Sequence, residues 1–290
     1  IYRSTFRLHF IILNTTRVFK NHLKIAWRAV IKNKTSSFIN ISGLSVGMAV
    51  ALLIGLWIYG EFSFNKVHEN YDRIVQVMQH QHYGDEVHTD KAIPIPLGKE
   101  LSRTYESDFK YVVLSSWTTA HLLSYEEKSI SQQGNFMTKD APEMLTLKMI
   151  SGSVHRLSDP SSILLSLSVS KALFADGNAI GQVIKLDTTK LKVTGVYQDL
   201  PENSSFSNLA FIAPWSIYAG TEENKNAIDD WNHNSFQLFA QVADNRAITE
   251  ISAKIKDIKL RALGPEGARL KPQVFLQPMS RWHLYAEFKN

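Results

Sequence analysis

One uninterrupted apolar segment near the N-terminus constrains this chain more than any other feature. The stretch INISGLSVGMAVALLIGLWIY has no charged side chain, and no charge occurs between Lys34 and Glu61. A helix rises about 1.5 Å per residue, so roughly 20 such residues cross a hydrocarbon core about 30 Å thick. A helix also satisfies its own backbone hydrogen bonds there. The segment therefore predicts a transmembrane helix at residues 39–60, with Trp57 and Tyr59 at the far headgroup region.

The charges on either side of this segment predict its orientation. Every Lys, Arg, Asp or Glu before the segment is a Lys or Arg, and the first acidic residue of the chain, Glu61, follows it. The positive-inside rule then places residues 1–38 in the cytoplasm and residues 61–290 outside the membrane. A signal peptide would have a shorter apolar core and small residues at a cleavage site, so we expect an uncleaved anchor. The preceding basic residues are Arg3, Arg7, Arg17, Lys20, Lys24, Arg28, Lys32 and Lys34.

The net charge of +5 arises in that basic flank, because the chain after the helix is slightly acidic. A basic flank suits anionic lipid headgroups, and the acidic balance of the outer part argues against a nucleic-acid partner. The chain contains no cysteine, which excludes disulfides, thiolate catalysis and zinc sites made of cysteines. The outer part must therefore fold on its hydrophobic core alone.

The segment KNHLKIAWRAVIKN, residues 20–33, has apolar and basic side chains on different sides of a helix. This pattern predicts an amphipathic helix that lies in the membrane interface before the transmembrane helix begins. The alternative is an ordinary basic flank that only sets the topology. The residues of the interfacial helix are Leu23, Trp27, Arg28 and Ile31. We assign no function to residues 1–18.

Small residues repeat every four positions within the transmembrane helix, at Gly43, Gly47, Ala51 and Gly55. Such a face lets a second helix approach closely, so we predict helix packing there. The alternative is that glycine and alanine are merely common in membrane helices. A partner helix would come from a second copy of the chain or from a part of the protein not included in this sequence.

The pattern of apolar residues and turns in residues 61–290 predicts an α+β domain with mixed sheets and packed helices. The clearest helix is 247–261, where isoleucines recur every three or four residues. The other helices are expected at 97–105, 142–147, 168–174 and 216–220. The strands are expected at 73–79, 111–115, 129–138, 162–166, 183–186, 192–197, 208–212, 236–242 and 272–276.

Two motifs that would indicate catalysis, GxxxxGK[ST] and HExxH, are missing from the sequence, so a nucleotide-hydrolysing loop and the commonest metalloprotease signature are excluded. The GxSxG spacing occurs once, at residues 43–47 inside the apolar segment, whereas the hydrolase motif lies between a strand and a helix. Three histidines cluster at His80, His82 and His88, of which His80 and His82 would point the same way on a strand and could pair on a metal. A solvated strand end or hairpin is the simpler interpretation of these histidines.

Two pairs of acidic residues also have a simple interpretation. Asp140 with Glu143, and Asp199 with Glu202, lie beside proline and asparagine in segments typical of turns. Helix capping and turn hydrogen bonds explain them better than paired acid–base catalysis. We therefore expect a non-catalytic chain with no cofactor and no metal.

Read in order, short segments of the chain resemble the MacB/FtsX-like ABC transporter permeases of bacteria. The resemblance covers residues from about 19 to 290, and Asn65 departs from it because relatives commonly carry Asp there. Gly181 and Gly195 lie in these segments and are expected in a tight turn or at a close backbone approach. The segments are 24–28, 32–34, 37, 39–41, 43–47, 61–65, 70–74, 159–160, 162–166, 172–174, 180–181, 193–196, 199–204 and 282–284.

The resemblance implies a MacB-like periplasmic core domain on a permease of the bacterial inner membrane. A separate or fused ABC ATPase would bind the cytoplasmic side of a dimeric or paired permease, which passes the motion to the outer domain. Such machines serve efflux, lipoprotein release or control of cell-wall hydrolases, sometimes with a periplasmic or outer-membrane partner. Relatives continue with three more membrane helices, so we expect this chain to be an N-terminal portion.

Two other classes of function remain open. A membrane-anchored ligand-binding or sensor module would need a small-molecule pocket in the outer domain. Sensors normally also carry a cytoplasmic output domain, for which the residues before the helix leave no room. A membrane-anchored hydrolase would need converging catalytic groups, and none of the candidates above favours that interpretation.

Overall fold

The computed structural model of the protein describes residues 18, 20–22, 24–175 and 177–283. The chain divides into two compact units, residues 1–62 and residues 63–290. Helix α2 (Lys34–Ser63) makes up most of the described part of the first unit, and its side chains are not buried by other parts of the protein. Within the described part of the chain, α2 is the one helix long and apolar enough to cross a membrane.

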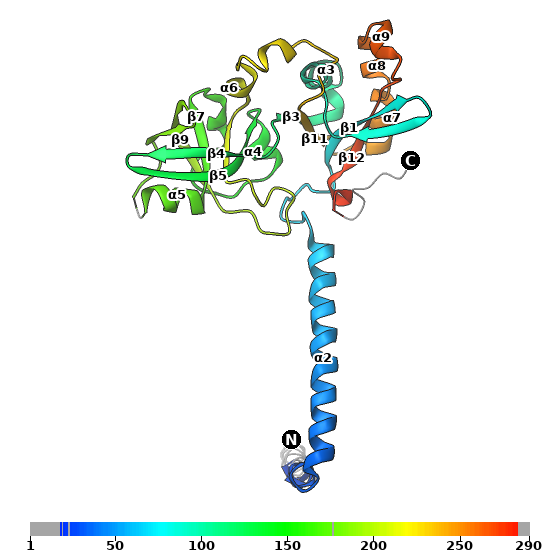
Figure 1. Cartoon of the computed structure of the whole chain (residues 1–290), viewed down its shortest axis with the longest axis vertical. Coiled ribbons are helices and arrows are strands. Elements are labelled where there is room, and N and C mark those ends of the chain that lie inside the picture. The colour runs from blue at the N-terminus through cyan, green and yellow to red at the C-terminus, as the bar shows by residue number, and fades with distance from the viewer. Residues whose placement is uncertain (1–17, 19, 23, 176, 284–290) are drawn as a thin grey trace, which may run out of the picture. The chain divides into compact units, whose positions relative to one another are not determined.

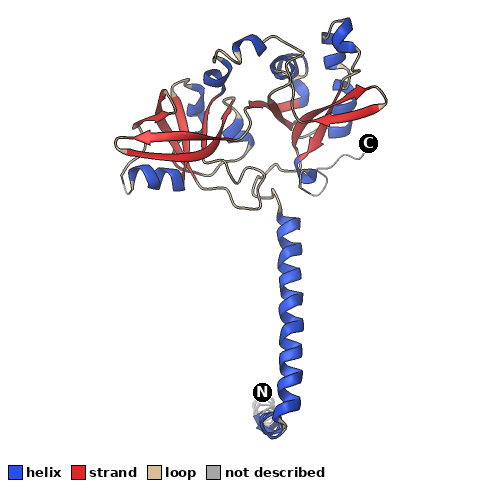
Figure 2. Cartoon of the chain, in the orientation of Figure 1, coloured by secondary structure: helices blue, strands red, loops and turns tan. Residues whose placement is uncertain are grey.

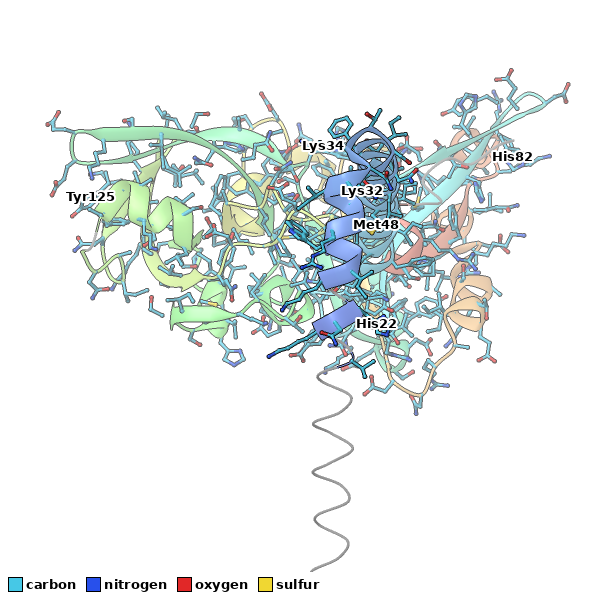
Figure 3. All side chains as sticks on the ribbon, turned by 90° about the horizontal axis from the view of Figure 1, so that it is seen from below. His22, Lys32, Lys34, Met48, His82 and Tyr125 are labelled. Carbon is cyan, nitrogen blue, oxygen red and sulfur yellow. The ribbon has the colours of Figure 1, made fainter. Side chains whose placement is uncertain are left out.

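The helix α2 extends beyond the predicted span of 39–60 at both ends. Backbone hydrogen bonds continue through polar residues such as Lys34 and Ser63, so the apolar stretch marks the hydrocarbon segment rather than the helix ends. Residues 24–32 are also helical and are separated from α2 by a turn at Asn33. Figure 3 looks along α2 and shows the helical segment with His22 and Lys32 running across its end.

One half of the second unit is an antiparallel sheet covered by helices, in the order β3-β11-β1-β12. The chain order β1-α3-β3 and later β11-α7-β12 makes this a split βαβ arrangement. A hydrophobic core that includes Val77, Leu101, Leu238 and Ile255 lies between sheet and helices. The elements are β1 (Ile74–Tyr83), α3 (Ile95–Thr104), β3 (Phe109–Ser115), β11 (Gln237–Val242), α7 (Ile248–Ile255) and β12 (Gln273–Pro278), with β2 (Glu86–Asp90) as a hairpin on β1.

The other half is inserted between β3 and β11, and its strands close into a ring. The strands pair in the cycle β4-β5-β10-β7-β9-β8 and back to β4. Leu123, Phe136, Leu165 and Phe211 fill its interior. The elements are β4 (Thr119–Tyr125), β5 (Lys128–Met137), β7 (Ser162–Ser166), α5 (Leu167–Phe174), β8 (Val183–Leu186), β9 (Thr189–Tyr197) and β10 (Phe211–Pro214). Figure 2 shows the strands of the two halves as two groups, and the pairing of Ser115 in β3 with Met137 in β5 joins them into one sheet.

A third hydrophobic cluster connects the halves. It joins Tyr197 from the ring of strands to Phe239 from the open sheet, with Phe206 and Met279 from the loops between them. Figure 3 shows Tyr125 and His82, which lie near the tips of two hairpins, on opposite sides of the unit. The remaining elements are α4 (Ala141–Met144), β6 (Met149–Gly152), α6 (Trp215–Ala219), α8 (Ile258–Ala262), α9 (Pro265–Ala268) and the short 3₁₀ turns η1 (Glu106–Asp108), η2 (Val154–Ser158), η3 (Lys225–Ala227) and η4 (Met279–Arg281).

The predicted α+β fold is confirmed, and the bounds of β7 and β8 coincide with the expected ones. The prediction of one helix at 247–261 is wrong, because the structure has two helices, α7 and α8. The carbonyl of Lys256 accepts a hydrogen bond from the Val274 N–H at 2.8 Å. The chain then turns so that the Lys259 ammonium reaches the buried side-chain oxygen of Gln79 at 2.5 Å.

Candidate functional site: the junction after the apolar helix

The first residues after α2 are held by Asn65, which has a φ of 62° and is 1% exposed. Asparagine tolerates this left-handed conformation because its short side chain forms local hydrogen bonds. Here the bonds reach distant parts of the chain. The Asn65 amide donates to Ser205 Oγ at 3.0 Å and to the Met279 carbonyl at 3.3 Å, and its Oδ1 accepts from the Ser205 N–H at 2.7 Å. Asn65 therefore joins the loop after β9 to the turn after β12.

The same loop also holds the end of α2. The Asn203 side-chain amide donates to Ser63 Oγ at 2.8 Å and to the Ser63 carbonyl at 3.3 Å. The Asn203 carbonyl in turn accepts from the Asn65 N–H at 2.7 Å. One loop residue thus satisfies a carbonyl at the end of the helix, where intrahelical partners run out.

His68 fixes the next turn of the junction. Its Nδ1 donates to the Leu145 carbonyl at 2.7 Å, since a carbonyl can only accept, and its Nε2 accepts from Ser204 Oγ at 3.0 Å. The ring is fully buried and meets Phe206 edge-on. Burial lowers the pKa of His68, and the hydrogen bond to Leu145 offsets only part of that effect. The neutral imidazole therefore acts as a buried connector.

Aromatic side chains close the junction from the C-terminal side. Phe64 stacks on His283 with a centroid separation of 4.0 Å, and the Trp282 ring contacts both Phe206 and Phe239. The residues that enter the domain at 63–71 are thus clamped between the loop at 203–206 and the turn at 279–283. The Ser204 hydroxyl is hydrogen-bonded to the His68 imidazole here, but both side chains are buried, so this pair is structural.

Sequence reasoning did not select Asn65, His68 or Asn203 as functional residues. It placed Asn203 in a turn and noted Asn65 only as a departure from the related permeases. The departure has a structural basis, because the Asn65 amide donates to the Met279 carbonyl and a carboxylate could not. The partners lie 140 and 214 residues away in the chain, so a local pattern carries no signal for them.

The residues predicted for membrane contacts lie on the first unit. A methyl group built on Gly43, Gly47 or Gly55 would meet nothing within 4 Å, so this face of α2 is open, and Ala51 is exposed on the same helix. In the helical segment before Asn33, Trp27 is 67% exposed and Ile31 is 50% exposed. Arg28 is exposed as well, whereas Leu23 lies outside the described residues. Their packing and interfacial roles remain predictions.

The three histidines considered for a metal lie on the β1–β2 hairpin. His80 is paired with Thr89 and His82 with Val87, whereas His88 is paired with Gln81. Paired residues share a face of the sheet and successive residues alternate, so His88 is on the opposite face from His80 and His82. Within the described residues no group of three potential ligands could hold a metal ion.

The acidic pairs behave differently from one another. The Asp199 carboxylate accepts from the Ser168 N–H at 3.2 Å and from Ser168 Oγ at 2.6 Å, so it caps the first turn of α5 as expected. The capping prediction is wrong for Asp140, which stands at the start of α4 without a side-chain cap bond. Glu143 instead binds His155 Nδ1 at 2.7 Å.

Helix, junction and domain together define a membrane-anchored α+β domain. The MacB-like periplasmic core domain family matches residues 37–258, more than half of the chain. The chain therefore belongs to this family, which occurs in ABC-type permeases and transporters. The resemblance found in the sequence is confirmed, although Leu284 and residues 1–17 lie outside the described residues.

Solved structures share this fold. A domain of a proposed permease protein from Porphyromonas gingivalis matches with a TM-score of 0.60 and 16% identity, over 72% of this chain and 90% of that one. The periplasmic region of MacB from Actinobacillus actinomycetemcomitans matches with a TM-score of 0.54 and 16% identity, over 78% of this chain and 99% of that one. The extracellular domain of the noncanonic ABC-type transporter YknZ from Gram-positive bacteria matches with a TM-score of 0.50 and 12% identity, over 70% of this chain and 99% of that one. No curated protein sequence matches the chain.

Proposed function

We propose that this chain is the permease part of an ABC transporter in the bacterial inner membrane. It transmits ATP-driven conformational change from a partner ATPase on the cytoplasmic side to a periplasmic domain, for export, efflux or lipoprotein release. Residues 1–38 would be cytoplasmic, residues 39–60 would span the membrane and residues 61–290 would form the periplasmic domain. The family match across helix and domain supports this proposal most directly. We assign no catalysis to the chain itself.

The junction supports a mechanical role. Asn65 and Asn203 tie the residues after α2 to loops that belong to both halves of the domain. A displacement of residues 63–65 would then reach both loops through these hydrogen bonds and the packed aromatic rings. Coupling through such a connection requires a contiguous network, which these residues supply.

The experiment that tests the proposal begins with the tagged protein purified from its own membrane. We expect it to retain a vanadate-sensitive ATP-hydrolysing subunit. Because the chain has no cysteine, a single cysteine placed at Asp85 on the β1–β2 turn can carry a fluorophore on each copy. Addition of ATP should change energy transfer between the two labels. Asn65→Ala with Asn203→Ala should preserve hydrolysis and reduce that change. A preparation without associated ATPase activity would favour the ligand-binding or sensor alternative.

The face of α2 formed by Gly43, Gly47, Ala51 and Gly55 supports pairing with a second membrane helix. Gly47→Ile should reduce self-association, measured by energy transfer in proteoliposomes. Ala49→Ile is the matched control, because it adds a similar side chain on the opposite side of the helix. Equal self-association in both variants would contradict packing at this face.

A further inference from the structure

An open cleft of about 510 Å³ lies between α7 and the edge strand β12. Figure 1 shows the two elements side by side, and β12 pairs with β1 on its other edge. The Leu276 N–H donates to Ser252 Oγ at 3.1 Å, and the Val274 N–H donates to the Lys256 carbonyl at 2.8 Å. These N–H groups are already bonded to α7, so the cleft is unsuited to the addition of another strand.

Much of the cleft wall is apolar. The Phe275 ring stacks on His80 with a centroid separation of 4.3 Å and an angle of 13° between the planes. Burial lowers the pKa of His80, and the neighbouring His82 lowers it further, which favours the neutral form of the stacked ring. The other apolar lining residues are Ile248, Ala253, Val274, Leu276 and Pro278.

Two cationic side chains, Lys256 and Arg281, also line the cleft, and its described lining residues include no Asp or Glu. Both are exposed. Neither has an acidic partner within 4.0 Å among the described residues. An ammonium and a guanidinium without such a partner bind carboxylate or phosphate oxygens through charge-assisted hydrogen bonds.

We propose that this cleft binds an anionic amphiphile, with its carboxylate or phosphate head at Lys256 and Arg281 and its apolar chain along Phe275 and Ile248. The cleft volume lies within the range of about 300–1,000 Å³ that is common for ligand sites. A free fatty acid and an acidic membrane lipid share this chemistry. The inference does not depend on coupling to an ATPase, so either can fail without the other.

The test measures fluorescence of 11-(dansylamino)undecanoate with the full chain in phosphatidylcholine nanodiscs, after subtraction of empty nanodiscs. We expect saturable binding that weakens in high salt. Lys256→Gln and Arg281→Gln should each weaken it about tenfold, the loss expected for a charge-assisted hydrogen bond. Lys185→Gln is the matched control, because it removes the same charge from an exposed position on β8.

A second variant separates shape from charge. Ala253 is exposed on α7 within the cleft, so Ala253→Trp should fill the cleft and abolish binding while both cations remain. The corresponding dansyl alcohol should bind more weakly than the acid. Competition by nanodiscs that contain phosphatidylglycerol would identify a membrane lipid as the source, and lack of competition a free amphiphile. Equal binding of acid and alcohol, or unchanged binding in Ala253→Trp, would overturn the proposal.

Discussion

Asn65 combines two requirements that few residues meet together. Its φ of 62° disfavours most side chains by about 1–2 kcal/mol, and its amide makes three hydrogen bonds that are buried or partly buried. Substitution by alanine would leave the Ser205 N–H and the Met279 carbonyl without these partners. Each unsatisfied buried group costs about 1–3 kcal/mol. We therefore expect Asn65→Ala to destabilise the protein by about 2–4 kcal/mol, measured as a lower Tm.

The matched variant is Asn65→Gly, which removes the same hydrogen bonds and relieves the backbone. We expect its Tm to lie between those of the wild-type protein and Asn65→Ala. Equal Tm values for alanine and glycine would show that the positive φ contributes nothing. A wild-type Tm in both variants would show that this junction is not held by Asn65.

His68 gives the junction a pH dependence whose sign follows from its lowered pKa. In the folded chain burial lowers the pKa of His68, whereas in the unfolded chain the ring binds a proton below about pH 6.5. The unfolded state then binds more protons, so stability is fully present above that pH and falls as the pH drops through this window. The Tm should therefore decrease between pH 7.5 and pH 5.5.

His68→Asn tests this assignment, because an amide can donate to the Leu145 carbonyl and does not titrate. We expect a smaller fall in Tm between the two pH values than in the wild-type protein. Some fall should remain, since burial also lowers the pKa of His80. An unchanged fall would mean that His68 is not the group responsible.

Among the elements, β6 and β9 approach each other through a pair of glycines. Gly152 is paired with Gly195, and a methyl group on Gly152 would lie 2.2 Å from the Thr194 carbonyl oxygen. Gly152→Ala should therefore lower the free energy of unfolding by about 3 kcal/mol or more, because alanine disfavours a positive φ and its methyl group would clash with the backbone. Gly181→Ala is the matched control: its φ of 87° is similar to the 78° of Gly152, but it has open space. Gly181→Ala should lower the free energy of unfolding by only about 1–2 kcal/mol. Equal Tm values for the two variants would contradict the close approach of Gly152 to β9.

The elements also show what sequence patterns could predict. β7 was predicted because SILLS has three consecutive apolar residues, and in the structure all five of its residues are buried. The strands β2, β4 and β6 were missed: EVHTD is polar at an exposed edge, TAHLLSY lacks strict alternation, and MISG is very short. The close approach expected at Gly195 is confirmed, but its partner Gly152 lies across the sheet and left no local pattern. The junction residues were missed for the same reason, because their partners are distant in the sequence.

At the scale of the domain, the chain enters and leaves the split βαβ half at one place. Asn65 lies before β1, and its amide binds Met279 just after β12. The ring of strands is inserted between β3 and β11, yet its loop at 203–206 reaches the same junction. Each half therefore has a direct connection to the residues that follow α2.

The direction in which α2 crosses the membrane decides which side of the bilayer the domain serves. The basic residues before α2 and the acidic balance after it predict a cytoplasmic N-terminus. A chain without cysteine allows single-site labelling at His22 and at Asp85, which lie before α2 and on the β1–β2 turn. In intact spheroplasts a membrane-impermeant maleimide should label Asp85→Cys, and it should label His22→Cys only after permeabilisation. Labelling of His22→Cys alone would invert the topology, and an ATPase in the cytoplasm would then meet the folded domain instead of the basic segment.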